Sequence, residues 1–331
     1  MRLGKSAGVF LLAAGCAGGA APGPLDDGAT LSAPLEIPAG MTVTIPPGAR
    51  LVAAPGVTIT VRGVLVVASA SRHARIGATT AMPDTSHAWG GLVVASGGRL
   101  DADGLDLAGA ATALTLAEGS AGARYDDGTI SDGGIPFQIH AGARLDTAHA
   151  AVVGATGASG IEGELHASHL DYASSSLGGG LVTMDPAAVL DATDSTFHGT
   201  ALGADFITSY AASLIHLAYS TVSDAHCAFH FDDITRFEID HVTTGSPDPS
   251  MTDAPLVVYG AMLYGAGAGP NTVSDSNFLG GAYGLDEQNA QGPLTVTNTF
   301  TRGNDANDGA SPWTWAAADV AKAPILDAKP R

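Results

Sequence analysis

Residues 122–146 read Gly-Ala-Arg-Tyr-Asp-Asp-Gly-Thr-Ile-Ser-Asp-Gly-Gly-Ile-Pro-Phe-Gln-Ile-His-Ala-Gly-Ala-Arg-Leu-Asp, so one Gly-Ala-Arg-x-Asp segment follows another after twenty residues. Similar segments recur along the chain, each with a hydrophobic residue after a turn. Aligned on that residue, the positions are Leu51, Leu100, Tyr125, Leu145, Leu165, Leu190, Ile215 and Phe237. The spacings are 49, 25, 20, 20, 25, 25 and 22 residues, and the first is interpreted as two units. Such a period predicts a solenoid of stacked repeats.

The segments between the turns have the pattern of strands. Apolar residues alternate with polar ones in Thr42–Ile45, Val57–Val61 and Leu294–Val296, and a period of two indicates a strand with one buried face. The 44 glycines, with Ser, Asn and Asp, punctuate strands of four to six residues. A unit of 20 to 25 residues suits three short strands and their corners, since a strand rises about 3.3 Å per residue.

This repeat resembles the right-handed parallel β-helix proteins of the pectin lyase-like class. We therefore expect an all-β chain whose residues 31–303 form a right-handed parallel β-helix of about ten rungs. Residues 304–331 break the repeat with Pro312-Trp-Thr-Trp315 and an alanine-rich segment. They are predicted to form a short cap, because an open strand edge at the end of a solenoid invites association.

The N-terminus has the pattern of an export signal. Arg2 and Lys5 precede the apolar run Ala7–Ala14, which is too short to span a bilayer. Ala13-Ala-Gly-Cys16 resembles a bacterial lipobox, although Ala13 stands where Leu is commoner. The resemblance implies a signal peptide at 1–15, lipidation of Cys16, a flexible tether at 16–30, and anchoring in the outer membrane or at the cell surface. An ordinary signal peptide is the alternative. If Cys16 is lipidated, Cys227 is the one remaining cysteine, and it is predicted to be a small buried core residue.

The charge balance is strongly acidic, with 14 Lys and Arg against 33 Asp and Glu and a net charge of −19. Loss of Arg2 and Lys5 with the signal peptide leaves 12 basic residues and a net charge of −21. Such a surface repels nucleic acid and anionic headgroups. The predicted partners are therefore a polysaccharide or an envelope protein, with membrane contact only through the lipid. Phosphate loops, dinucleotide fingerprints and the common hydrolase motifs are absent.

The richest polar segment is Asp224–His241. Strand alternation predicts that Cys227, Phe229 and Phe231 face inward, while His226, Ala228, His230 and Asp232 face outward. An outward row of two histidines and a carboxylate is a candidate substrate or metal site.

The pair Asp232-Asp233 resembles the adjacent aspartates of polygalacturonase-like enzymes. The resemblance ends there, because the Asn-Thr-Asp, Gly-His-Gly and Arg-Ile-Lys segments of such enzymes are absent. The candidate catalytic residues are Asp232, Asp233, Arg236 and His230. The candidate ligand-binding residues are His226, Glu238, Tyr259 and Tyr264, since flat aromatic rings stack on sugars. No cofactor is expected, apart from a calcium ion of the kind that acidic residues hold in β-helix lyases.

Two functional hypotheses follow. The first is a lipid-anchored, non-catalytic surface protein that binds a polysaccharide or an envelope protein, which the scarcity of Lys and Arg favours. The second is a polysaccharide hydrolase or lyase with its site on Asp224–His241, whose paired carboxylates would lie about 5 to 9.5 Å apart in a hydrolase. A structural explanation competes with both, in which Asp232-Asp233 is a turn between rungs and the histidines are ordinary solvated side chains.

Overall fold

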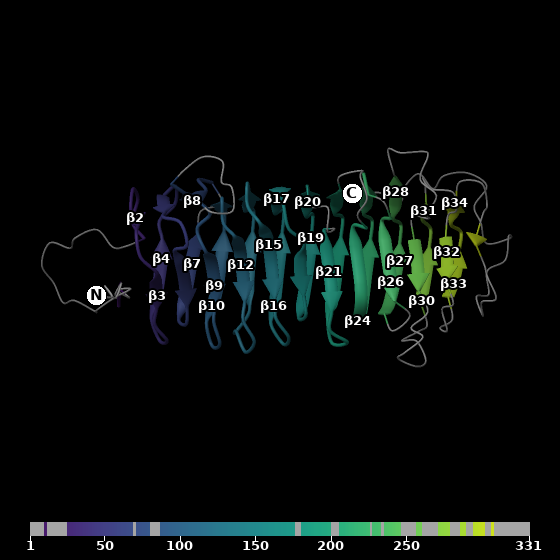
Figure 1. Cartoon of the computed structure of the whole chain (residues 1–331), viewed down its shortest axis with the longest axis horizontal. Coiled ribbons are helices and arrows are strands. Elements are labelled where there is room, and N and C mark those ends of the chain that lie inside the picture. The colour runs from purple at the N-terminus through teal and green to yellow at the C-terminus, as the bar shows by residue number, and fades with distance from the viewer. Residues whose placement is uncertain are drawn as a thin grey trace, which may run out of the picture.

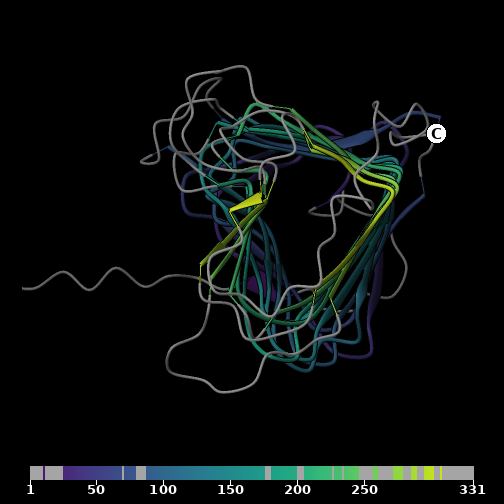
Figure 2. The same cartoon turned by 90° about the vertical axis from the view of Figure 1, so that its right-hand side faces the viewer.

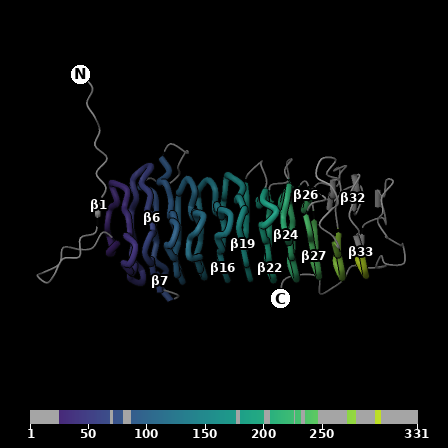
Figure 3. Tube along the Cα trace, turned by 90° about the horizontal axis from the view of Figure 1, so that it is seen from below, coloured from purple at the N-terminus to yellow at the C-terminus, as the bar shows by residue number. Residues whose placement is uncertain are grey.

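The computed structural model describes residues 10–11, 25–68, 71–79, 87–175, 180–199, 205–225, 227–232, 235–245, 256–259, 271–278, 285–288, 294–301 and 306–307. They form an elongated stack of short strands that cross its long axis (Figure 1). Viewed along that axis, the coil has three sides (Figure 2), and its rungs succeed one another in chain order (Figure 3). The described residues contain no helix, and so none that is long and apolar enough to cross a membrane.

Three stacks of parallel strands, here called sheets A, B and C, make the sides of the coil. Sheet A contains β1 (Phe10–Leu11), β3 (Leu35–Ile37), β6 (Thr58–Val61), β9 (Gly91–Val94), β12 (Thr112–Leu116), β15 (Ile135–Ile139), β18 (Ser159–Ile161), β21 (Leu181–Met184), the first part of β24 (Ile207–Ala218), β26 (Phe229–Asp232), β29 (Leu256–Tyr259), β32 (Leu285–Gln288) and β35 (Ala306–Asn307). Sheet C contains β4 (Thr42–Ile45), β7 (Val64–Ala68), β10 (Arg99–Asp103), β13 (Ala123–Asp126), β16 (Arg144–Ala148), β19 (Glu164–Ser168), β22 (Val189–Thr193), the second part of β24, β27 (Thr235–Asp240), β30 (Asn271–Ser274) and β33 (Leu294–Thr297).

Sheet B contains β2 (Thr30–Leu31), β5 (Arg50–Ala53), β8 (Ala74–Ala78), β11 (Leu105–Ala108), β14 (Thr129–Ser131), β17 (Ala151–Ala155), β20 (Asp171–Ser174), β23 (Thr196–His198), β25 (Thr221–Ser223), β28 (Thr243–Gly245), β31 (Asn277–Phe278) and β34 (Phe300–Thr301). Each turn of the coil passes through sheets A, C and B in that order. The long strand β24 belongs to both A and C, which joins them into one sheet of 23 strands beside the 12 strands of sheet B.

Every strand pairing is parallel, and equivalent residues of successive turns lie opposite each other, as in β16 and β19, where Leu145 faces Leu165. The predicted all-β, right-handed parallel β-helix is therefore confirmed, with a number of turns close to the ten expected. At the C-terminal end, Ala306 pairs with Leu285, so the stacking continues to β35. The rest of the predicted cap, like Cys16 and most of the predicted signal and tether, lies outside the described residues.

The core fills the inside of the coil with the inward residues of all three sheets. Aromatic rings occupy much of it, with Phe229, Phe231 and Phe237 almost fully buried. Trp89 is also buried and donates its indole N–H to the Ala108 carbonyl at 2.9 Å. The inward orientation predicted for Cys227, Phe229 and Phe231 is confirmed, and Cys227 is a buried thiol that is not part of a disulfide. The burial of apolar side chains is the main contribution to the stability of a solenoid. A single rung cannot bury its own inward side chains, so they are covered only when neighbouring rungs stack on it.

Two positions of the sequence alignment differ from the structural register. Leu51 lies in β5 of sheet B opposite Ile76, whereas Leu100 lies in sheet C opposite Leu65. The similar turns Gly48-Ala-Arg50 and Gly97-Gly-Arg99 thus precede strands of different sheets. Tyr125 is displaced by two residues, because it faces Ala102 while Ala123 faces Leu100. The connection before β13 is longer, and a shift of two keeps a side chain on the same face, so Tyr125 is still fully buried.

One corner, between sheets C and B, is built on single residues in the left-handed conformation. Its members have positive φ in successive turns, and most are not glycine: Gly104, Asp127, His149, His169, Asp194, Tyr219, His241, Asp275 and Asn298. The backbone N–H of each of the first eight donates to a carbonyl of the next turn, as from His149 to Ser168 at 3.0 Å. We call these nine residues the corner column. Stacked rings also link its members, with 4.5 Å between the ring centroids of His149 and His169 and 4.6 Å between those of Tyr219 and His241.

Candidate functional site

A row of charged side chains runs along the outer face of sheet C, one per turn. We call it the charged row, and its members are paired in register: Asp101, Arg124, Asp146, His166, Asp191, His216 and Glu238. Acidic and basic residues alternate along it, which avoids the cost of like charges on neighbouring strands. Each member directly follows an inward hydrophobic residue of the strand, so strand alternation turns it outward.

Ion pairs link the charged row to its neighbours. Arg124 Nη1 lies 3.3 Å from Asp101 Oδ1, and Arg124 Nη2 lies 2.5 Å from Asp126 Oδ2. Asp191 bridges two histidines, with His166 Nδ1 at 3.2 Å and His216 Nδ1 at 2.7 Å. Each of these side chains therefore has at least one partner of opposite type on the same or the neighbouring strand.

A second arginine beside the row is anchored in the same way. Arg144 Nη2 lies 2.6 Å from Asp146 Oδ1, and its Nη1 lies 3.4 Å from Glu164 Oε2. The hydrogen bond that Arg144 donates to Asp146 is the main cause that raises the pKa of Arg144 above its usual value, and Glu164 raises it further. For Arg124, partial burial lowers the pKa, but the attraction of Asp126 and Asp101 outweighs it and raises the pKa. Both guanidinium groups are thus permanent cations that present N–H donors on this face.

Two adjoining hollows lie over this part of sheet C. The larger has a volume of about 600 Å³ and is lined by three arginines, Arg99, Arg124 and Arg144, with the small residues Ser120 to Ala123 beneath them. The smaller has a volume of about 310 Å³ and is lined by Arg124, Asp146, His166, Asp191 and neighbouring small residues. Because Arg124 and Asp146 line both, the two hollows make one shallow groove along the axis of the coil. Its floor offers hydrogen-bond donors and acceptors in alternation.

The site residues predicted from the sequence are divided between two sheets. His230 and Asp232 belong to β26 of sheet A, whereas Arg236 and Glu238 belong to β27 of sheet C. His230 Nδ1 lies 2.5 Å from Asp205 Oδ2, a partner that the sequence analysis did not single out. On sheet C, Arg236 Nη2 forms an ion pair with Glu238 Oε1.

Asp232 of β26 is paired in register with Tyr259 of β29, so the backbones of these two predicted residues are neighbours in sheet A. His226, Asp233 and Tyr264 lie outside the described residues. The structure therefore brings Asp232 and Tyr259 to one sheet and places Glu238 in the charged row, which is on another.

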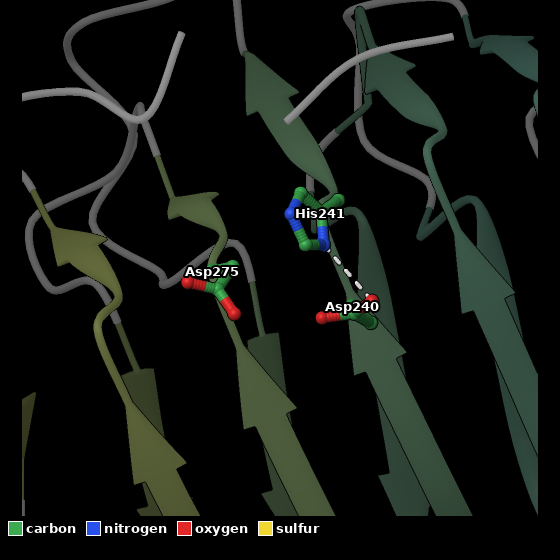
Figure 4. Close-up of side chains that lie close together, drawn as sticks. All are labelled: Asp240, His241 and Asp275. Atoms are coloured by element: carbon green, nitrogen blue, oxygen red, sulfur yellow. Dashed lines mark ion pairs between the residues drawn. The ribbon is translucent and has the colours of Figure 1, made fainter. Parts of the chain in front are cut away.

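A second polar cluster lies at the corner column, where Asp240, His241 and Asp275 approach one another (Figure 4). One ligand atom from each lies within 4.8 Å of the others. His241 Nδ1 is 2.9 Å from Asp240 Oδ2, Ser274 donates to Asp240 at 2.7 Å, and Asn298 donates to Asp275 at 2.5 Å. Calcium prefers six to eight oxygen ligands, so an imidazole and two hydrogen-bonded carboxylates are a poor match for that ion.

The sequence analysis missed the charged row, although the signal was present in its own alignment. Asp101, Asp146, His166 and Asp191 each come directly after an aligned hydrophobic residue. From Leu100 onward, a polar residue follows every aligned hydrophobic residue, whereas Leu51 is followed by Val52. The segment Asp224–His241 is the more conspicuous feature of the sequence, because the charged row is spread over more than a hundred residues.

No family model, curated protein or solved structure matches this chain. Any function must therefore be argued from the geometry of the chain itself.

Proposed function

We propose that this protein is a non-catalytic recognition module that binds an extended polysaccharide along the groove on sheet C. The observation that carries the proposal is the middle of the charged row, Arg124, Asp146, His166 and Asp191, which lines two adjoining hollows. Its side chains recur at the strand spacing, about 4.8 Å. A ligand that itself repeats along one direction can use such a row many times, and each contact adds to the affinity.

The chemistry of the groove fits binding better than cleavage. Asp101, Asp126 and Asp146 each already accept a hydrogen bond or ion pair from a guanidinium group. A hydrolase instead needs two carboxyl groups that face a shared substrate, one as proton donor and one as base or nucleophile. Arginine forks offer several donors to sugar hydroxyls and to the carboxylates of acidic sugars.

The proposal includes export and lipid anchoring at Cys16, on the strength of the lipobox-like segment Ala13–Cys16. An anchored solenoid would hold the groove at the cell surface, where polysaccharide is present. The resemblance to pectin lyase-like β-helix proteins supports the same ligand class. An envelope protein is the alternative partner, since a long flat sheet face also suits a protein surface.

One observation favours the enzymatic alternative. A histidine oriented by a carboxylate is a common arrangement for a general base, and His230 of β26, the strand that also contains Asp232, is held in this way by Asp205. A polysaccharide hydrolase or lyase acting there is therefore the second candidate.

One experiment tests both candidates. The purified full chain is presented with a panel of neutral and acidic polysaccharides, and both binding and the appearance of new reducing or unsaturated ends are measured. We expect binding without new ends. Arg124→Gln should weaken binding by about tenfold, because it removes the cation that lines both hollows and leaves Asp126 without its guanidinium partner.

The matched control is Arg62→Gln, which removes an exposed arginine paired with Glu36 outside the groove and should bind as the wild type does. Equal affinity of the wild type and Arg124→Gln would refute the groove on sheet C. New ends that disappear in Asp232→Asn or Asp233→Asn would replace the binding proposal by the enzymatic one.

A further inference from the structure

Three arginines gather on the outer face of sheet B, away from the groove on sheet C. Arg50, Arg72 and Arg75 line a hollow of about 410 Å³ together with Gly48, His73 and Asp106. They represent three of only 14 Lys and Arg residues in a chain with a net charge of −19. A local concentration of cations in such an acidic protein calls for a physical explanation.

Their arrangement carries an electrostatic cost. Arg50 and Arg75 are directly opposite each other in neighbouring strands β5 and β8, and like charges in that position destabilise a sheet. All three side chains are exposed, and among the described residues no carboxylate lies within ion-pair distance of any of their guanidinium groups. The arginines of sheet C differ in this respect, since Arg124 and Arg144 each have two acidic partners.

The carboxylates near the hollow are engaged elsewhere. Asp106 faces Arg75 in register, but its Oδ1 lies 3.0 Å from His73 Nδ1 and accepts the Thr129 backbone N–H at 3.2 Å. Asp27 accepts the backbone N–H of Arg50 at 2.9 Å. The acids thus hold a histidine and two backbone groups, and the three guanidinium groups keep their positive charge for another partner.

The backbone holds the arginines in place. The Arg72 carbonyl accepts the Gly48 N–H at 2.8 Å, and the Arg75 N–H donates to the Ala49 carbonyl at 2.8 Å. A Cβ atom on Gly48 would lie 2.8 Å from Arg72 Nη2, so the missing side chain of Gly48 leaves the space in which the Arg72 guanidinium lies. These hydrogen bonds fix the backbone from which the guanidinium groups extend, so no backbone ordering has to accompany binding.

We propose that this hollow, formed by Arg50, Arg72 and Arg75, binds a phosphate group. Planar guanidinium forks match the oxygens of a phosphate, and a dianion placed among three cations relieves their mutual repulsion. The hollow is larger than a single phosphate needs, which leaves room for an attached solute, sugar or lipid. The proposal does not depend on the groove of sheet C or on lipidation.

Calorimetry on the full chain with inorganic phosphate, in a low-salt Tris chloride buffer, tests the proposal. Wild type should bind, and Arg75→Gln should bind at least about tenfold more weakly, since it removes the central fork. Arg75→Lys keeps the positive charge but loses the planar guanidinium group, so its affinity for phosphate should lie between those of the wild type and Arg75→Gln. Arg62→Gln, which removes the same charge outside the hollow, should match the wild type.

The double variant Arg50→Gln/Arg75→Gln guards against a folding artefact. Without phosphate it should unfold at the same temperature as the wild type or higher, because the opposed charges are gone, and phosphate should no longer raise that temperature. Binding that is unchanged in Arg75→Gln, or weakened as much in Arg62→Gln, would overturn the proposal.

Vesicles identify the source of the phosphate group. Phosphatidylglycerol and phosphatidylcholine vesicles are compared with the Cys16→Ser chain and with Cys16→Ser/Arg75→Gln. Phosphatidylglycerol binding that depends on Arg75, with no response to inorganic phosphate, would assign a lipid headgroup. A response to inorganic phosphate alone would assign a soluble phosphate compound. No binding of either probe would refute the site.

Discussion

At the scale of single residues, the buried tyrosines show how polar atoms are accommodated in the core. The Tyr172 hydroxyl donates to the Gly180 carbonyl at 3.0 Å and lies 2.9 Å from Ser159 Oγ, which accepts the Phe137 N–H. The Tyr125 hydroxyl donates to the Leu105 carbonyl at 2.6 Å. Burial raises the pKa of both tyrosines, and for Tyr125 the charge of Asp106 raises it further.

These shifts predict a loss of stability in alkaline solution. The unfolded tyrosine loses its proton at about pH 10, whereas the folded one keeps it to higher pH, so the unfolded state is favoured as pH rises above 10. Each tyrosine contributes up to about 1.4 kcal/mol per pH unit in that window and nothing below it. Denaturant unfolding between pH 7 and 11.5 measures the slope. Tyr172→Phe should reduce it and cost about 1 kcal/mol at pH 7, from the lost hydrogen bonds.

Tyr210→Phe is the matched control, because Tyr210 is 53% exposed and its removal should leave the alkaline slope unchanged. A slope that is the same in Tyr172→Phe and the wild type would mean that the buried hydroxyl is not what destabilises the chain at high pH.

At the scale of elements, the corner column between sheets C and B marks where each strand of sheet C from β10 to β33 ends. Asp127 is representative, with φ of 49° and a backbone N–H that donates to Ala148 at 2.9 Å. Asp, Asn and Gly tolerate this conformation, whereas a β-branched side chain clashes there. The corner is therefore encoded by single residues rather than by a long turn.

Substitutions at Asp127 test this interpretation. Asp127→Gly should be as stable as the wild type or more so, and Asp127→Val should lose about 1–2 kcal/mol through strain at positive φ. Denaturant midpoints measure both. Thr129→Val, in the neighbouring strand β14, should change little because strands accept valine. Equal midpoints for the Val and Gly variants would show that the corner does not constrain the residue.

At the scale of the whole molecule, the chain is a long acidic rod whose cations are concentrated in two places. Arg99, Arg124 and Arg144 line the groove of sheet C, while the phosphate hollow lies on sheet B toward the N-terminal end. If the chain is anchored at Cys16, the second of these would be nearer to the membrane along the coil.

Cys16→Ser tests the anchor. Without a thiol to acylate, the protein should move from the membrane fraction to the soluble fraction of the expressing cells, and metabolic labelling with a fatty acid should be lost. Cys227→Ser is the matched control, because that thiol is buried, and its fractionation should be unchanged. Membrane association of Cys16→Ser equal to that of the wild type would exclude lipidation as the anchor.

The sequence by itself determined the fold class, because a twenty-residue repeat of alternating strands can bury its apolar face only by stacking. It also determined the inward orientation of Cys227, Phe229 and Phe231, which follows from strand alternation alone. It did not determine which sheet a given turn precedes, as Leu51 shows, since identical Gly-Ala-Arg turns occur at different corners.

Only the tertiary structure decided which residues meet on a surface. Asp101 and Arg124 are 23 residues apart, and Arg50 and Arg75 are 25 apart, yet each pair is opposed on neighbouring strands. Conversely, the dense segment Asp224–His241 is divided between two sheets by a corner. In a solenoid, residues that are adjacent in space are one turn apart in the sequence. The number of residues in a turn varies with the length of its loops. Which side chains meet on the surface is therefore determined by the register of the strands, which only the tertiary structure shows.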